Sequence, residues 1–253
     1  MRFAYLGSGS RGNAALIQAG ATTLMVDCGF SLADSERRLA RLGVNPGSLS
    51  AIVVTHEHGD HINGVARLAC KYRIPVWLTH GTHAGWPGNN VPLLGFCSAH
   101  TAFTVGDIEV QPYPVPHDAR EPCQFVLSDG ARRVGVLSDA GHITPHIRAS
   151  LSGCHALLVE CNHDPEMLAN GPYTESLKQR VGGPLGHLSN GQTADLLREI
   201  DLTQLQHLVV AHISETNNTP ALARAAVAAA MNCAEDWIAI ADQDQGLDWR
   251  EVR

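Results

Sequence analysis

The sequence lacks any long hydrophobic run. Its longest apolar stretch, Ala221 to Met231, is interrupted by Arg224 and is shorter than the roughly 18 residues that a membrane span needs. The beginning of the chain also lacks the apolar core of a secretory signal peptide, because a glycine comes already at position 7. These absences predict a cytoplasmic protein with no membrane as a partner.

Cysteine pairs at a close, regular spacing are also missing. The 7 cysteines are an odd number, are dispersed along the chain and include no C-x-x-C pair, which argues against a disulfide framework and against a zinc ribbon. Most of them lie in apolar context, so we expect buried thiols. The formal net charge of −7 argues against a protein that coats nucleic acid, although a local basic groove remains compatible with it.

The composition is that of a folded chain. Of 253 residues, 44% are hydrophobic and 17% are charged, which supplies ample side chains for a core. Along the chain, predicted strands come first and predicted helices follow between further strands, and this order occurs twice. We therefore predict an α/β protein in which two β-sheets pack together with helices outside, as a single domain over 1–253.

The expected elements follow from apolar periodicity and from turn residues. A helix should follow a cap at Ser31, and residues 237–240 should be the last strand. Residues 81–95, rich in Gly, Pro and Asn, should be irregular. The other helices are expected over 61–72, 189–199 and 220–231. The other strands are expected over 3–6, 15–19, 22–26, 51–55, 76–79, 101–105, 108–115, 123–128, 133–137, 156–160 and 207–211.

Histidine is abundant, with 14 residues, and it is concentrated in one loop. His56, His58, Asp60 and His61 fall between a predicted buried strand and a predicted helix. Imidazole and carboxylate donors suit zinc, manganese or iron. One ion cannot comfortably use all four donors of so short a loop, so the pattern predicts two adjacent divalent metal ions. The alternative is a histidine-rich polar surface loop.

This H-x-H-x-D-H pattern after a strand resembles the signature of the metallo-β-lactamase fold, an αββα sandwich of two mixed β-sheets. Asp27 resembles the aspartate that supports the metal loop of that fold without binding metal. The resemblance implies that the first ion is bound by His56, His58 and His117. It implies further that Asp60, His61 and His212 bind the second ion and that Asp139 is shared by both.

Within this fold the chain is similar to the WalJ (YycJ)-like exonuclease group, whose members are described as cytosolic 5′→3′ exonucleases. The similarity rests on the phrases LGSGSRGN at 6–13, NHD at 162–164, GHLSN at 186–190, SETNNTP at 214–220 and ADQ at 241–243. It implies a nucleic acid, and DNA in preference to RNA, as substrate and partner. The sequence gives no oligomeric state.

His187 resembles the histidine that contacts phosphate, or protonates the leaving group, in phosphodiesterases of this fold. It stands between a glycine and a predicted helix start, where backbone N–H groups attract anions. The alternative is a histidine packed under that helix. We expect His187 and Asp60 to be the catalytic residues. Further substrate contacts are expected from Ser8, Ser10, Arg11, Asn13 and His163, against the alternative that the Gly-rich turn at 7–13 is only a tight turn.

The predicted function is therefore phosphodiester hydrolysis by attack of a metal-bridging hydroxide on phosphorus. The resemblance narrows this to a 5′→3′ DNA exonuclease. Two other functions stay open. One is hydrolysis of a small ester, a thioester or a cyclic phosphodiester on the same fold. The other is a non-catalytic, metal-stabilised interaction protein, which would be expected to have lost some of the ligands.

Overall fold

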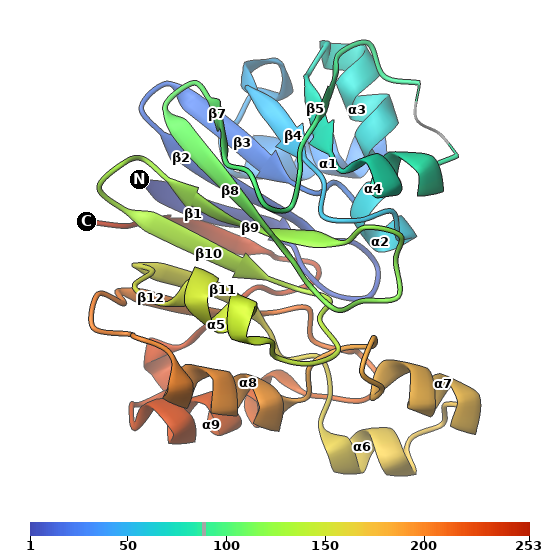
Figure 1. The fold of residues 1–253 in the computed structure, drawn as a ribbon, viewed down its shortest axis with the longest axis vertical. Coiled ribbons are helices and arrows are strands. Elements are labelled where there is room, and N and C mark those ends of the chain that lie inside the picture. Colours follow the sequence, from blue (N-terminus) through green and yellow to red (C-terminus); the bar gives the residue numbers. More distant parts are fainter. Residues whose placement is uncertain (88–89) are drawn as a thin grey trace.

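Two seven-stranded mixed sheets face each other in the computed structural model, which describes residues 1–87 and 90–253 (Figure 1). The first sheet, in spatial order, consists of β14 (Leu247–Glu251), β1 (Arg2–Gly7), β2 (Ala14–Ala19), β3 (Thr22–Val26), β4 (Ala51–Val53), β5 (Val76–Leu78) and β6 (Leu94–Phe96). The second consists of β13 (Ala239–Ile240), β12 (His207–Ala211), β11 (Ala156–Glu160), β10 (Arg133–Leu137), β9 (Cys123–Ser128), β8 (Ile108–Pro114) and β7 (Phe103–Val105).

Each sheet has an antiparallel half and a parallel half. In the first sheet the pairs from β14 to β3 are antiparallel and those from β3 to β6 are parallel. In the second, the pairs from β7 to β10 are antiparallel and those from β10 to β13 are parallel. The parallel halves bring several strand carboxyl ends to one edge, where ligands bind in open α/β sheets. In Figure 1 this edge lies near α2, away from both chain termini.

Alternating side chains fill the space between the sheets. On β8, Ile108 and Val110 are fully buried while Glu109 and Gln111 are exposed, as the two-residue period of a strand requires. Phe3 of the first sheet and Phe125 of the second belong to the same inner core. This shared apolar core is what holds the two sheets face to face.

Helices cover the outer faces of both sheets (Figure 1). On the first sheet pack α1 (Leu32–Arg41) and α3 (Val65–Tyr72), through residues such as Leu39 and Leu68. On the second pack α5 (Pro145–Leu151), α8 (Asn190–Glu199) and α9 (Pro220–Met231), through residues such as Leu197 and Val227. The remaining helices are α2 (Gly59–Ile62), α4 (His80–Gly85), α6 (Pro165–Asn170) and α7 (Glu175–Val181). The layers are thus α, β, β and α, as predicted.

Three sequence-based predictions about elements are wrong. The helix expected over 61–72 is broken at 63–64, because the backbone N–H of Gly64 donates to the Cys28 carbonyl oxygen at 2.8 Å and not to a carbonyl of the helix. The stretch 81–95 is not wholly irregular, since it contains most of α4 and the start of β6, and its residues 88–89 lie outside the described part. Residues 237–240 do not include the last strand, because β14 follows and pairs with β1.

Within the described ranges, no helix has the length and apolar character required to cross a membrane. Of the cysteines, Cys28, Cys97, Cys123, Cys154 and Cys161 are buried free thiols as expected, Cys70 is exposed and Cys233 is half-buried.

Candidate metal centre

The histidine-rich loop between β4 and α2 is anchored by a buried carboxylate. Asp27 accepts hydrogen bonds from the backbone N–H and the hydroxyl of Thr55, both at 2.8 Å, and its Oδ2 lies 2.8 Å from Nδ1 of His61. The second nitrogen of His61 is thereby turned toward the other carboxylates of the centre. The position of Asp27 agrees with the supporting role that the resemblance implied.

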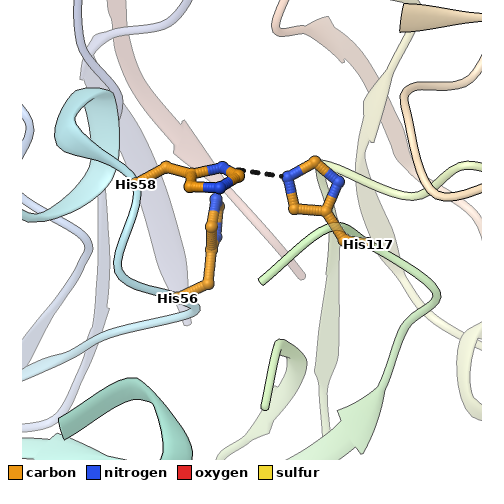
Figure 2. Close-up of side chains that lie close together, drawn as sticks. All are labelled: His56, His58 and His117. Carbon is orange, nitrogen blue, oxygen red and sulfur yellow. Dashed lines mark hydrogen bonds between the residues drawn. The ribbon is translucent and has the colours of Figure 1, made fainter. Parts of the chain in front are cut away.

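His56, His58 and His117 form the first cluster of donors (Figure 2). Their ring centroids are 4.6 Å apart for His56 and His58, and 4.9 Å apart for each of the two pairs with His117. Nε2 of His117 lies 3.1 Å from Nδ1 of His58, while Nδ1 of His117 lies 3.0 Å from the Gly186 carbonyl oxygen. The His117 ring is therefore oriented by the backbone, with its other nitrogen directed at the cluster.

Asp60, His61 and His212 form the second cluster. Oδ2 of Asp60 lies 3.3 Å from Nε2 of His61 and 3.3 Å from Nε2 of His212. Asp139 lies between the clusters: its Oδ2 is 3.1 Å from Nε2 of His61, and its Oδ1 is 3.8 Å from Nε2 of both His117 and His212. Asp139 is the carboxylate that can serve both clusters at once.

Three of these residues have a left-handed backbone. Asp27, Asp139 and His212 have φ angles of 59°, 52° and 51°, a region that Asp, Asn and His enter more readily than other non-glycine residues. Each of them stands just after the carboxyl end of a strand, namely β3, β10 or β12. The sharp turn there directs the side chain across the sheet edge, and this conformation is one that clusters at functional sites.

Glu160, at the end of β11, is a part of the centre that the sequence analysis did not identify. It is fully buried. Its Oε1 lies 2.8 Å from Nδ1 of His187 and 3.0 Å from Nδ1 of His212, and its Oε2 accepts hydrogen bonds from the backbone N–H groups of Ala140 and Leu188. A signal for Glu160 was available in the sequence, because it is an acidic residue at the end of an apolar strand. The neighbouring strands β10 and β12 are also followed by candidate ligands, Asp139 and His212.

Burial and neighbouring charges shift the ionisation of these groups in opposite directions. Burial, with the positive field of His61, lowers the pKa of His56 well below its ordinary value. Burial opposes charge on His212, but the negative charge of Asp139 and the hydrogen bonds that His212 donates to Asp60 and Glu160 raise its pKa to about 10. Burial also opposes charge on Glu160, yet His187 lowers its pKa to about 2. The carboxylates and imidazoles thus form one mutually dependent set.

The chemistry of the donors fits divalent metal ions. Nε2 of His56 is a buried polar atom that has no hydrogen-bond partner within the described residues, although the residue is only 1% exposed. A buried nitrogen left without a partner is destabilising unless something binds it. Its neighbours supply nitrogen and carboxylate oxygen atoms within 4.8 Å of one another, the ligand types that zinc, manganese and iron take.

A cavity opens beside the centre. Its volume is about 260 Å³, and it is lined on one side by His58, Asp60, Asp139, His187 and His212. The other lining residues come from α7 and the turn before it, and from the loops at Ser10, Asp118, Asn162, Gly186 and 214–217. Four of the seven candidate metal ligands therefore face a space that can take a substrate.

The model of the β-lactamase superfamily domain matches residues 22–213. The chain belongs to this superfamily. It is accordingly a metal-dependent hydrolase, and the resemblance noted in the sequence is confirmed.

Sequence relatives cover nearly the whole chain. The exodeoxyribonuclease YycJ of Bacillus anthracis is 34% identical over 231 residues, which are 90% of this chain and 88% of that protein. The exodeoxyribonuclease WalJ of Streptococcus pneumoniae is 30% identical over 258 residues, which are 98% of this chain and 92% of that protein. Among solved structures, the metallo-β-lactamase fold protein YhfI of Bacillus subtilis has a TM-score of 0.76 at 15% identity, covering 99% of each chain. The last comparison supports the fold.

The Gly-rich turn of this superfamily member lies beneath the metal loop. Ser8 and Asn13 are 4% and 6% exposed. Ser8 Oγ donates to Asn13 Oδ1 at 2.9 Å and accepts from the backbone N–H of His212, while Asn13 Nδ2 lies 3.3 Å from Asp60 Oδ2. Their polar groups are used in supporting the centre, and the expected contact of Ser8 and Asn13 with substrate stays a prediction. Ser10 is exposed and does line the cavity.

Arg11 and His163 lie outside the set that lines the cavity. The Arg11 guanidinium is paired with Glu215 at 2.8 Å and with Asp244 at 2.9 Å on the surface. His163 is 4% exposed and lines a different hollow, between α6 and α7. Neither residue lines this cavity, and their expected contact with substrate stays a prediction. Glu57 braces its loop, as its Oε1 accepts from the backbone N–H of Arg120.

Proposed function

We propose that this chain is a dinuclear-metal phosphodiesterase that degrades DNA as a 5′→3′ exonuclease, and that it forms one domain over 1–253. The observation that carries the proposal is the convergence of seven donor residues from both sheets in adjoining clusters, four of which line one cavity. The similarity to two exodeoxyribonucleases over almost the whole chain supports DNA as the substrate. An interaction protein would have no need of the complete set.

In this proposal His56, His58 and His117 hold one ion, Asp60, His61 and His212 hold a second, and Asp139 is shared. Zinc, manganese and iron each suit these donors. Two such ions, when bound, polarise the phosphoryl oxygen and lower the pKa of water so that it can act as the nucleophile at neutral pH. This division takes two of the four overlapping groups of possible ligands, and the position of Asp139 near His61 and His117 supports it. The other two groups both contain Asp139.

His187 acts on the substrate. Because its Nδ1 faces Glu160 at 2.8 Å, its ring is fixed and its Nε2 is left for the cavity that it lines. From there it holds a phosphoryl oxygen by a hydrogen bond or delivers a proton to the leaving oxygen. Glu160 keeps the proton of the imidazole on Nδ1 when the ring is neutral, and so sets which nitrogen serves the substrate.

The test is cleavage of single- and double-stranded DNA and RNA carrying a label at the 5′ or at the 3′ end, with zinc, manganese or iron added. We expect release of 5′-labelled mononucleotides from DNA, and none from Asp139→Asn, which keeps the size of the side chain and removes its charge. A ladder of 3′-shortened products would contradict the direction. Hydrolysis of a thioester or a cyclic nucleotide without cleavage of any strand would contradict the nuclease proposal itself.

A further inference from the structure

The cavity has a second wall that the metal chemistry does not use. Leu177, Arg180 and Val181 are spaced so that they share one face of α7, and all three line the cavity, as does Tyr173 in the turn before the helix. This wall is apolar except for one guanidinium group. We propose that this wall is a subsite for the nucleotide beside the scissile bond, in which Arg180 binds a second phosphate group of the substrate. The inference rests on the phosphodiesterase function proposed above.

Arg180 is held near the centre by one carboxylate. Its Nε donates to Oδ2 of Asp118 at 2.5 Å, and Oδ1 of Asp118 lies 3.5 Å from Nε2 of His117 and 3.8 Å from Nε2 of His58. Within the described ranges, Asp118 is the side-chain partner recorded for this guanidinium, and the Arg180 side chain remains 61% exposed. Since a guanidinium has five N–H donors in a planar fork, the two Nη atoms remain for an anion.

The end of α7 is fixed to the segment that carries His187. The backbone N–H of His187 donates to the Val181 carbonyl oxygen at 2.8 Å, and the backbone N–H of Asp118 donates to the Leu185 carbonyl oxygen at 3.0 Å. Gly186 packs so closely that a Cβ atom there would lie 2.2 Å from the carbonyl oxygens of Arg180 and Val181. Arg180 therefore stands on backbone whose position is set by the centre itself, and a preorganised group binds with a smaller loss of entropy.

Charge distinguishes Arg180 from the other lining residues. Among those that the structure describes, it is the one Lys or Arg at the cavity, which also contains Asp60, Asp118 and Asp139. These carboxylates would repel any phosphate group that is not bound by the metal ions, unless a cation such as Arg180 offsets their charge. The planar fork of arginine matches phosphate oxygens in a way that no other lining side chain does.

The apolar part of the wall suits a nucleoside. Tyr173, Leu177 and Val181 are partly exposed, so they present surface on which a base or a sugar can lie, and bases stack on aromatic rings without regard to sequence. A cavity of about 260 Å³ is close to the lower limit of small-ligand sites, which begin at about 300 Å³. In this proposal it takes one terminal nucleotide, and the rest of the strand lies outside.

The test uses three short substrates with the metal-loaded protein. Thymidylyl thymidine has the scissile phosphate alone, and its 5′-phosphorylated and 3′-phosphorylated forms each add one terminal phosphate. We expect the wild type to prefer one of the phosphorylated forms, which identifies the side of the scissile bond that faces α7. Arg180→Gln should lower kcat/KM for that form about 10-fold to 100-fold more than for thymidylyl thymidine, as loss of a charge-assisted hydrogen bond implies.

Arg198→Gln is the matched control, because Arg198 is an exposed arginine of α8 whose recorded side-chain partner is Asp195. It removes the same charge and should leave the substrate preference as in the wild type. Equal losses of Arg180→Gln on all three substrates, or no loss on any, would overturn the inference while leaving the proposed nuclease function in place.

A binding measurement separates the two proposals. Calorimetry of the metal-loaded protein compares thymidine 3′,5′-bisphosphate with the 5′- and 3′-monophosphates, none of which contains a diester. The bisphosphate should bind about 10-fold more tightly than the better monophosphate in the wild type, and this advantage should vanish in Arg180→Gln. If it does so although no strand is cleaved, the subsite stands and the nuclease proposal fails. If the advantage is absent or survives the substitution, the subsite fails.

Discussion

Glu160 connects two histidines that have different roles in the proposed reaction. Its Oε1 faces both His187 and His212, and two backbone N–H groups hold its Oε2. A carboxylate behind a ligating histidine fixes the ring and raises its basicity. The same carboxylate therefore orients a candidate ligand and a candidate substrate contact, which makes it a positioning residue for both.

Replacing Glu160 with Gln keeps the size of the side chain but removes the charge and one acceptor atom. The affinity for the second ion should fall about 10-fold to 100-fold, the usual effect of losing such a partner of a ligand. Competition with a coloured chelator measures this change directly. Glu109→Gln, on the exposed face of β8, is the control and should leave the affinity as it is. Unchanged affinity in Glu160→Gln would mean that His212 needs no carboxylate behind it.

Replacing His187 with Ala separates a substrate contact from a ligand. Metal content should stay at the wild-type value, whereas turnover of DNA should fall about 10²-fold to 10⁴-fold if His187 supplies a proton. The loss should be smaller with a nitrophenyl phosphodiester, whose leaving group needs no proton. His142→Ala is the control, because His142 is an exposed histidine that contacts the Pro184 carbonyl oxygen. Loss of one ion per chain in His187→Ala would instead assign His187 to the metal shell.

The sequence predicted those site residues whose signal is local. His56, His58, Asp60 and His61 stand close together in the chain, so their spacing alone indicated a shared site. Glu160 and Arg180 carry no such signal, because each becomes recognisable only when separate segments meet: Glu160 contacts His187 across 27 positions and Arg180 contacts Asp118 across 62. Contacts of that kind depend on the tertiary fold and on no local pattern.

The break between α2 and α3 positions the metal loop. The backbone N–H of Gly64 donates to the Cys28 carbonyl oxygen at 2.8 Å, and that of Cys28 donates to the His61 carbonyl oxygen at 2.8 Å. The helical periodicity of 61–72 gave no sign of the break, since a tertiary contact with the segment 28–30 causes it.

Gly64→Ala should therefore destabilise the protein. The new Cβ atom would lie 2.0 Å from the Phe30 carbonyl oxygen, a backbone atom that cannot move aside alone. We expect a loss of about 1–3 kcal/mol in the free energy of unfolding, as for other overpacked sites, measured by urea denaturation. Gly191→Ala in α8 is the control, because the nearest atom there is 3.9 Å away, and alanine in a helix adds up to about 1 kcal/mol. Equal stability of the two variants would contradict the steric argument.

Strands were predicted better than short helices. The limits of β3, β9, β10, β11 and β12 coincide with those expected, because these strands are short apolar runs buried on both sides. The helices α5, α6 and α7 span six or seven residues each, which is too short for a clear 3.6-residue period. β14 was missed because it is an exposed edge strand with alternating charges.

The two sheets meet at the metal centre as well as at the apolar core. His56, His58, Asp60 and His61 follow β4 of the first sheet, whereas His117, Asp139 and His212 follow β8, β10 and β12 of the second. Ions bound by both groups would tie the edges of the sheets together. Without ions, the same edge holds several buried charged groups that lie close to one another, and burying such groups is unfavourable unless they are paired.

Removal of the metal should accordingly lower the thermal stability of the whole chain. A ligand that binds only the folded state at 1,000 times its dissociation constant stabilises that state by about 4 kcal/mol. For a chain of this size each 1 kcal/mol shifts Tm by about 2–4 °C. We therefore expect EDTA to lower Tm by about 10 °C or more in scanning calorimetry, and added zinc or manganese to restore it. Asp139→Asn should show a smaller shift, because it lacks the carboxylate that both ions share. If the wild type binds two ions and its Tm is the same with and without them, the ions do not link the sheets, and the division of ligands proposed here is wrong.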